Sequence, residues 1–174
     1  LINLKIVQPQ FDIEYLTKNY QLVFNSIFTG KQKIFNQISN CMKLTYHDFL
    51  MDSIKENNNE PIYQLFIEIR NKLLKLAPNN VITILNQECN ENKLNFLLER
   101  YIDDVEIEIK YLITLYIEIV ISLDAPINDN NNLIWKNKLF SKFENKLSDK
   151  LPFILISISE MIDSILFQIN KLIN

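Results

Sequence analysis

The most constraining feature of this sequence is that Gly30 is its only glycine. Glycine is the usual residue wherever the backbone needs a positive φ angle, as in the tight turns of β-hairpins and in phosphate-binding loops. Asparagine can replace it in turns, and the asparagine runs at residues 57–59 and 130–132 are expected to form loops. Hairpin-rich sheets and glycine-rich nucleotide sites are therefore both disfavoured. The chain is expected to be helical.

Apolar residues spaced three and four positions apart support this expectation over the first third of the chain. Residues 13–27 form one such run, and Gly30 stands where a glycine would cap the C-terminus of the resulting helix. Residues 34–42 form a second run. Thr45 and Asp48 have the spacing of a capping box, which predicts that a third helix starts there. The two runs consist of Ile13, Leu16, Tyr20, Val23, Ile27, Ile34, Phe35, Ile38 and Met42.

The clearest single helix is expected over residues 61–76. Pro61 suits a first helical position, where an N–H group would have no intrahelical partner, and Pro78 would stop the helix. Glu68 and Lys72 are spaced to form an ion pair on the outer face. The apolar face consists of Ile62, Leu65, Phe66, Ile69, Leu73 and Leu76.

Residues 103–123 are compatible with either a strand or a helix. Every odd position from Val105 to Leu123 is apolar, and charged residues alternate with the first of them, as in a strand. A strand of about 19 residues would be roughly three times the usual length, and no turn residue divides it. As a helix, the segment starts with Asp103 and Glu106 in capping-box spacing and keeps only one narrow polar stripe. We predict a long, buried central helix.

Two more helices are expected in the C-terminal part of the chain. Residues 133–147 form an amphipathic segment around Trp135, and residues 152–173 carry the most regular apolar seam of the sequence. At roughly 1.5–3 kcal/mol for each buried side chain, that seam would contribute more than about 10 kcal/mol before the cost of ordering the chain. The seam consists of Leu151, Leu155, Ile158, Ile162, Ile165, Ile169 and Leu172.

Together these segments predict an all-α, irregular bundle of about seven to eight helices, with short helices over residues 81–88 and 92–101. No repeat and no linker divides the chain, so residues 1–174 are expected to form a single helical domain. The first residue is Leu1 and not a methionine, which would suit a fragment of a longer chain. Ile69, Leu73, Leu112, Tyr116 and Ile119 are predicted to lie in the core.

Composition excludes several classes of partner. The net charge is −3 and the signs are mixed along the chain, without the basic surface that nucleic-acid binding needs. Every window of 18 residues contains a charge, so no membrane span is expected. Cys41 and Cys89 stand on apolar-periodic segments and are expected to be small buried hydrophobic residues, with a disulfide as the lesser alternative. Free thiols favour a reducing, cytoplasmic compartment.

Residues suited to catalysis or metal binding are few. His47 is the only histidine and lies in no catalytic signature, and one histidine with two separated cysteines is too few ligands for a zinc site. The acidic residues 103–108 lack the spacing of a calcium loop, and carboxylates at a helix start complement the helix dipole. We expect a protein that is not an enzyme and has no catalytic residue, no metal, no cofactor and no small-molecule substrate.

Four short segments, in order, resemble the T-complex protein 11 family over about residues 48–174. Residues 49–54 resemble the family's Phe-Trp-Asp-Ser-Leu block, and residues 68–78 resemble its Glu-Ile-Arg helix with a closing proline. Residues 123–129 are similar to its Leu-Cys-Ala-Pro-Val-Arg-Asp segment, except that Asn128 replaces the arginine, and in the C-terminal helix Leu166 replaces an asparagine. The motif positions kept here are Asp52, Glu68, Arg70, Pro78, Ala125, Pro126 and Asp129.

The resemblance implies a helical, non-enzymatic protein that binds other proteins of a larger assembly. Members of that family are associated with flagella and axonemal regulatory assemblies, so we expect a structural or regulatory subunit of a ciliary or flagellar axoneme. A cytoplasmic adaptor in cyclic-AMP-dependent protein kinase signalling is the alternative. A viral Bcl-2-like bundle that holds an amphipathic helix in a groove is a further alternative, but no Asn-Trp-Gly-Arg motif surrounds Trp135.

The C-terminal helix is expected to carry the protein interface. It has more apolar residues than one buried stripe can hide, and monomers rarely leave a large apolar patch in water. The candidate interface residues are Phe153, Ile156, Met161 and Phe167.

Residues 125–129 are expected to form an ordered turn between two helices. Pro126 disfavours helical backbone at Ala125 and so stops the long helix. Asp129 is expected to cap the following turn by accepting backbone N–H groups.

Overall fold

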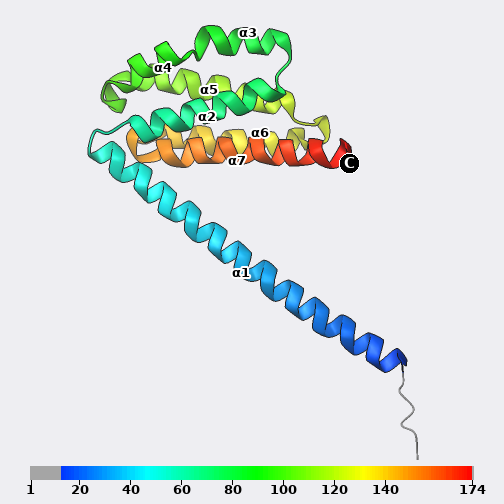
Figure 1. Cartoon of the computed structure of the whole chain (residues 1–174). Coiled ribbons are helices and arrows are strands. Elements are labelled where there is room, and N and C mark those ends of the chain that lie inside the picture. The colour runs from blue at the N-terminus through cyan, green and yellow to red at the C-terminus, as the bar shows by residue number, and fades with distance from the viewer. Residues whose placement is uncertain (1–12, 174) are drawn as a thin grey trace, which may run out of the picture. The chain divides into compact units, whose positions relative to one another are not determined.

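The computed structural model of the chain describes the backbone of residues 13–173 and the side chains of residues 29–171 (Figure 1). Helices account for 90% of it, and none of the residues it describes forms a strand, which confirms the all-α class. The chain divides into two units, residues 1–45 and residues 46–174. The expectation of a single domain over residues 1–174 stays a prediction.

The first helix, α1 (Ile13–Lys55), is unbroken where the sequence predicted three helices. Gly30 does not cap it, because its φ angle is not positive and the helix continues through it. Thr45 opens no new helix either: its hydroxyl donates to the carbonyl oxygen of Cys41 at 3.0 Å, a bond made within a continuing helix. The predicted run at residues 13–27 lies within α1, and its side chains lie outside the described residues.

An asparagine ends α1, as the asparagine run at residues 57–59 predicted. Asn57 adopts a φ angle of 55°, the left-handed conformation that glycine usually supplies. The N–H of Asn58 donates to the carbonyl oxygen of Ser53 at 2.8 Å, and that of Asn57 to Ile54 at 3.0 Å. These two bonds form a Schellman motif, which satisfies the last carbonyl groups of the helix.

Six α-helices lie wholly within residues 46–174, fewer than the seven to eight expected for the bundle. Three of them, α2 (Glu60–Leu76), α5 (Glu106–Leu123) and α7 (Leu147–Ile173), pack against one another around the core. Two short helices, α3 (Asn79–Glu88) and α4 (Glu91–Leu98), follow α2 and lie on the opposite side of this unit from α7 (Figure 1).

The helix α2 begins and ends close to the predicted positions. Pro61 occupies its first turn, and the chain leaves the helix at Ala77, just before Pro78. The side chains that face the core are Ile62, Leu65, Phe66, Ile69 and Leu73. Lys72 and Glu68 form the expected ion pair, with 2.8 Å between Lys72 Nζ and Glu68 Oε1.

The ambiguous segment is helical: a 3₁₀ turn, η1 (Ile102–Val105), leads into α5. The predicted core residues Leu112, Tyr116 and Ile119 are buried, as are Ile69 and Leu73 of α2. Burial of α5 is not complete, however. Ile107 is 82% exposed and Tyr111 is 54% exposed, so one apolar face of this helix is left in contact with solvent.

The predicted helix over residues 133–147 is divided. It consists of α6 (Asp129–Phe140) and a 3₁₀ turn, η3 (Ser141–Glu144), in which the rings of Phe140 and Phe143 pack with centroids 5.4 Å apart. The following helix, α7, starts at Leu147 and contains Pro152. Beginning five residues earlier than predicted costs a hydrogen bond at Pro152. It also buries Leu147, which extends the apolar seam by one position before Leu151.

The seam of α7 confirms the prediction for most of its length. Leu151, Leu155, Ile158, Ile162 and Ile165 are buried, Ile169 is 37% exposed, and Leu172 lies outside the described side chains. By length and composition, α7 is the one helix in the described part of the chain that could cross a membrane. Such a stretch is equally typical of a core helix, and this seam packs against α2 and α5.

Candidate protein-binding groove

Acidic and metal-binding side chains are dispersed over the bundle. Among the described side chains, no three from His, Cys, Asp and Glu come together in a group that could hold a metal ion. The acidic run at residues 103–108 is split: Asp103 pairs with Lys146 at 2.8 Å, while Glu106 pairs with Lys110 on its own helix. Asp103 thereby links η1 to the segment before α7, and the pair of Glu106 lies within α5.

The remaining candidates for chemistry are single residues. His47 lies on α1, with its Nδ1 3.4 Å from Oδ1 of Asp48. Cys89 is buried, and desolvation raises the pKa of its thiol to about 11. Cys41, expected to be buried, is exposed, because it lies on the part of α1 where apolar side chains also face outward.

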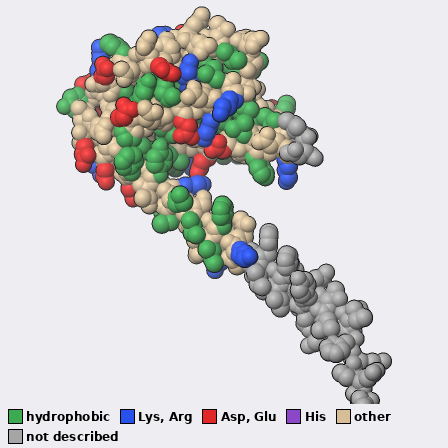
Figure 2. Space-filling model, viewed as in Figure 1, with side chains coloured by type: hydrophobic (Ala, Val, Ile, Leu, Met, Phe, Trp, Pro, Cys, Tyr) green, Lys and Arg blue, Asp and Glu red, His purple; other side chains and the backbone are tan. Residues whose placement is uncertain are grey.

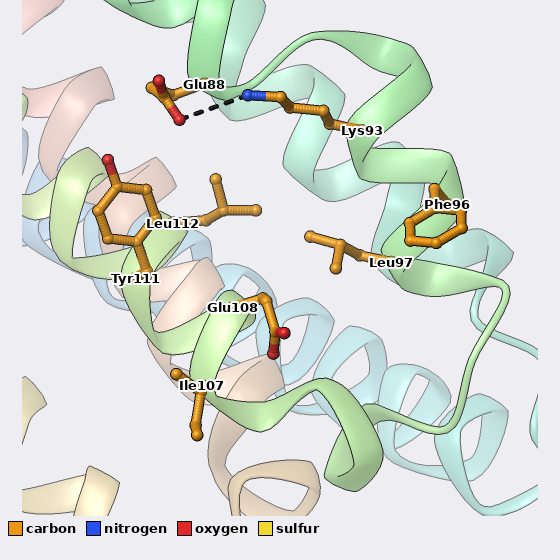
Figure 3. Close-up of a pocket in the computed structure, with 8 residues that line it drawn as sticks. All are labelled: Glu88, Lys93, Phe96, Leu97, Ile107, Glu108, Tyr111 and Leu112. Atoms are coloured by element: carbon orange, nitrogen blue, oxygen red, sulfur yellow. Dashed lines mark hydrogen bonds and ion pairs between the residues drawn. The ribbon is translucent and has the colours of Figure 1, made fainter.

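A hollow on the surface of the bundle lies between α4 and the first half of α5 (Figure 3). It measures about 450 Å³ and is lined by Glu88, Lys93, Phe96, Leu97, Ile107, Glu108, Tyr111 and Leu112. We call this hollow the α4–α5 groove. Its volume lies within the range of sites that take a small molecule or a few side chains of a partner.

The groove is apolar because two helices expose large side chains toward the same space. Ile107 and Tyr111 are four residues apart on α5 and so share one face of the helix. Phe96 on α4 is 56% exposed, and the guanidinium of Arg100 lies 4.3 Å from its ring centroid. In Figure 3, Leu97 and Leu112 point toward each other across the groove.

Three charged side chains line the α4–α5 groove: Glu88, Lys93 and Glu108. Glu88 pairs with Lys93 at 3.4 Å, as Figure 3 shows, so this acidic charge is largely balanced. Glu108 also lines the groove and makes no ion pair or hydrogen bond with any described residue. The groove therefore combines an apolar floor with one carboxylate, Glu108, that pairs with no described residue.

The sequence of α5 contains a signal for an uncovered apolar surface. In the segment 103–123, apolar residues occupy more than one helical face, and the prediction of a buried central helix assigns all of them to the core. The bundle covers the face that carries Ile109, Ile113 and Tyr116, but Ile107 and Tyr111 lie on a second face. An excess of apolar faces on one helix, beyond what its neighbours can cover, is the pattern that indicates such a surface.

The family-motif residues on α1 and α2 lie outside the groove and make local contacts. Asp52 pairs with Lys55 at 2.9 Å, Glu68 pairs with Lys72, and Arg70 donates to the Asn86 side chain at 2.9 Å. The third contact joins α2 to α3. Pro78 sits at the N-cap position of α3.

The motif at residues 124–129 forms the expected turn, but a different aspartate organises it. The chain leaves α5 at Asp124 and passes through a 3₁₀ turn, η2 (Pro126–Asn128), into α6. Asp124 accepts hydrogen bonds from the Ala125 N–H at 2.8 Å, from the Asn128 side chain at 3.0 Å and from the Asn132 side chain at 2.9 Å. Asp129 makes no capping bond, because it is already the first residue of α6. The expectation of an Asp129 cap is wrong.

The proposed interface residues on α7 are partly covered by their own chain. Phe153 is 37% exposed, and the ammonium groups of Lys138 and Lys142 lie 5.9 and 5.8 Å from its ring centroid. Ile156 and Met161 are half-buried, and Phe167 is 66% exposed. An interface at Phe153, Ile156, Met161 and Phe167 stays a prediction.

Comparisons with protein-family models, with curated proteins and with solved structures found no match to this chain.

Proposed function

We propose that this chain is a non-catalytic protein that binds an amphipathic helix of another polypeptide in its α4–α5 groove. The observation that carries the proposal is the combination of exposed Ile107, Tyr111 and Phe96 with the unpaired carboxylate of Glu108. An apolar groove between two helices is suited to the apolar face of a third helix. Because the carboxylate of Glu108 is unpaired, the groove favours a helix whose polar residues are basic.

A subunit of a ciliary or flagellar axonemal assembly is the setting that we propose for this binding. The resemblance of residues 48–174 to the T-complex protein 11 family supports it. Co-purification with isolated axonemes, kept through a salt wash, is the expected result for such a subunit. A protein found only in the soluble fraction of ciliated cells would contradict this setting without contradicting the groove.

The binding proposal is tested with two designed peptides of equal length. One is an amphipathic helix with leucines on one face and lysines on the other, and the second has glutamate in place of each lysine. Fluorescence anisotropy with the full chain is expected to show binding of the basic peptide, and its affinity should fall about tenfold or more in Glu108→Lys.

Glu144→Lys is the matched control for this experiment, because Glu144 is exposed and does not line the groove. This variant changes the net charge equally and is expected to keep the affinity within about twofold. Equal losses in the two variants would mean that the peptide responds to net charge alone. Equal affinity of the basic and the acidic peptide would contradict the proposed role of the rim.

A further inference from the structure

The helix α1 exposes a second apolar surface. Ile34, Phe35, Ile38 and Met42 are each more than half exposed. At about 100° per residue, these four side chains span roughly 100° of the helix circumference and so form one stripe. We call Ile34, Phe35, Ile38 and Met42 the α1 stripe. Figure 2 shows apolar side chains on the surface of α1.

The charges around the α1 stripe are all positive. Residues 29–45 contain Lys31, Lys33 and Lys43 and no acidic residue. Lys31 lies four residues before Phe35, on the same face as the stripe. Two copies of this segment packed side by side would bring like charges together, which disfavours a coiled coil of α1 with itself.

The α1 stripe and the α4–α5 groove have complementary chemistry. One is a basic helix with an apolar face, and the other is an apolar hollow between helices with a carboxylate, Glu108, that has no partner in the described part of the chain. The apolar side chains of the stripe match the apolar floor of the groove, and its lysines match the charge of Glu108. Because of this complementarity, the α1 stripe is a candidate ligand of the groove.

We propose that the α1 stripe of one copy of this protein packs into the α4–α5 groove of a second copy. The inference rests on the proposed function of the groove and names its partner. The apolar side chains of the stripe would cover Ile107, Tyr111 and Phe96, and Lys31 would approach Glu108. The two surfaces differ, so the contact is heterologous: it either closes when two copies exchange their helices or continues into a chain of copies.

A charge-reversal experiment tests this contact on the full chain. Lys31→Glu and Glu108→Lys change exposed residues outside the core, so circular dichroism is expected to show unchanged helix content. Analytical ultracentrifugation at micromolar concentration should show self-association of the natural chain and at least about a tenfold weakening in each variant. An equimolar mixture of the two variants is expected to associate again, because it pairs unlike charges in both possible contacts.

Re-association of the mixture is the decisive result, since a general effect of charge or folding would not produce it. The control Glu144→Lys should associate like the natural chain. A natural chain that stays monomeric, or a mixture that associates no better than its separate components, overturns the inference. Neither result alters the binding of the designed basic peptide, so failure of this inference and failure of the proposed function are distinguishable.

Cys41 provides a second, independent measurement. It is exposed on α1, one residue from Met42, whereas Cys89 is buried and the pKa of its thiol is raised to about 11, so Cys41 is the thiol open to labelling. A benzophenone maleimide on Cys41 of unlabelled protein, mixed with ¹⁵N-labelled protein, should cross-link to ¹⁵N-labelled peptides from α4 and α5. Cross-links confined to the copy that carries the probe would identify the chain's own groove as the acceptor and overturn the inference.

Discussion

At the scale of single residues, asparagine and aspartate form the helix ends and turns of this chain. Asn57 supplies the left-handed residue that ends α1, and Asn59 donates from its side chain to the carbonyl oxygens of Leu98 and Arg100, both at 2.9 Å. The bonds of Asn59 join the start of α2 to the last residue of α4 and to the segment that follows it. A chain with one glycine therefore makes its helix ends with polar side chains.

Asp124 is the residue whose loss should affect the α5–α6 turn most. Burial alone would raise the pKa of its carboxyl, but hydrogen bonds from Asn128, Asn132 and the Ala125 N–H outweigh this effect and lower the pKa. We expect Asp124→Ala to reduce the free energy of unfolding by about 1–2 kcal/mol at pH 7. Denaturant titration measures this difference, with Asp129→Ala as the control because Asp129 makes no capping bond.

The pH dependence of this effect follows from the direction of the pKa shift. Because the pKa of Asp124 in the folded state lies below the unfolded value of about 3.9, its stabilising contribution is present above that value. It is lost as the pH falls through the folded-state pKa. The difference between the natural chain and Asp124→Ala should therefore shrink below about pH 4. A difference that persists unchanged in acid, or a control that loses as much stability, would refute the assigned role.

At the scale of secondary-structure elements, the sequence predicted helix type better than helix ends. The length of segment 103–123 and the absence of a turn residue within it decided correctly for a helix over a strand. The predicted helix end at Gly30 is wrong, because a glycine permits a positive φ angle but does not impose one. The predicted helix start at Pro152 is also wrong. The burial of Leu147 outweighs the hydrogen bond that a proline inside a helix removes.

Replacing Gly30 tests whether α1 is continuous. A Cβ atom at this position would meet no heavy atom within 4 Å, and the backbone is helical. We expect Gly30→Ala to stabilise the helix by about 0.5–1 kcal/mol, because alanine loses less conformational freedom than glycine on folding. Thermal unfolding followed by circular dichroism measures this change. If Gly30 were a left-handed cap instead, the same substitution would lower the stability.

At the scale of the whole molecule, the core could be predicted from apolar spacing, whereas the position of the groove could not. Spacing assigns a residue to a face of its helix, and the five predicted core residues are all buried. Which faces stay uncovered depends on how many neighbours a helix acquires. For Ile107 and Tyr111, this depends on the placement of the short helix α4, which local periodicity does not determine.

Two isoleucines on α5 should show the difference between core and groove. Ile113 is fully buried and Ile107 is 82% exposed, although both belong to the same helix. Ile113→Ala is expected to cost about 2–5 kcal/mol of unfolding free energy through the lost burial and the cavity. Ile107→Ala should cost less than about 0.5 kcal/mol. Similar losses at both positions, measured by denaturant titration, would mean that the face with Ile107 is also packed.

The location of bound peptide on the full chain tests the central claim most directly. Methyl-labelled isoleucine, leucine and methionine can be followed by NMR while the basic amphipathic peptide is added. The α4–α5 groove predicts that the largest shift changes occur at Leu97, Ile107 and Leu112, with little change at the buried Ile158 of α7. Changes centred instead on Ile156 and Met161 would place the interface on α7 and contradict the groove, as would the absence of any localised change.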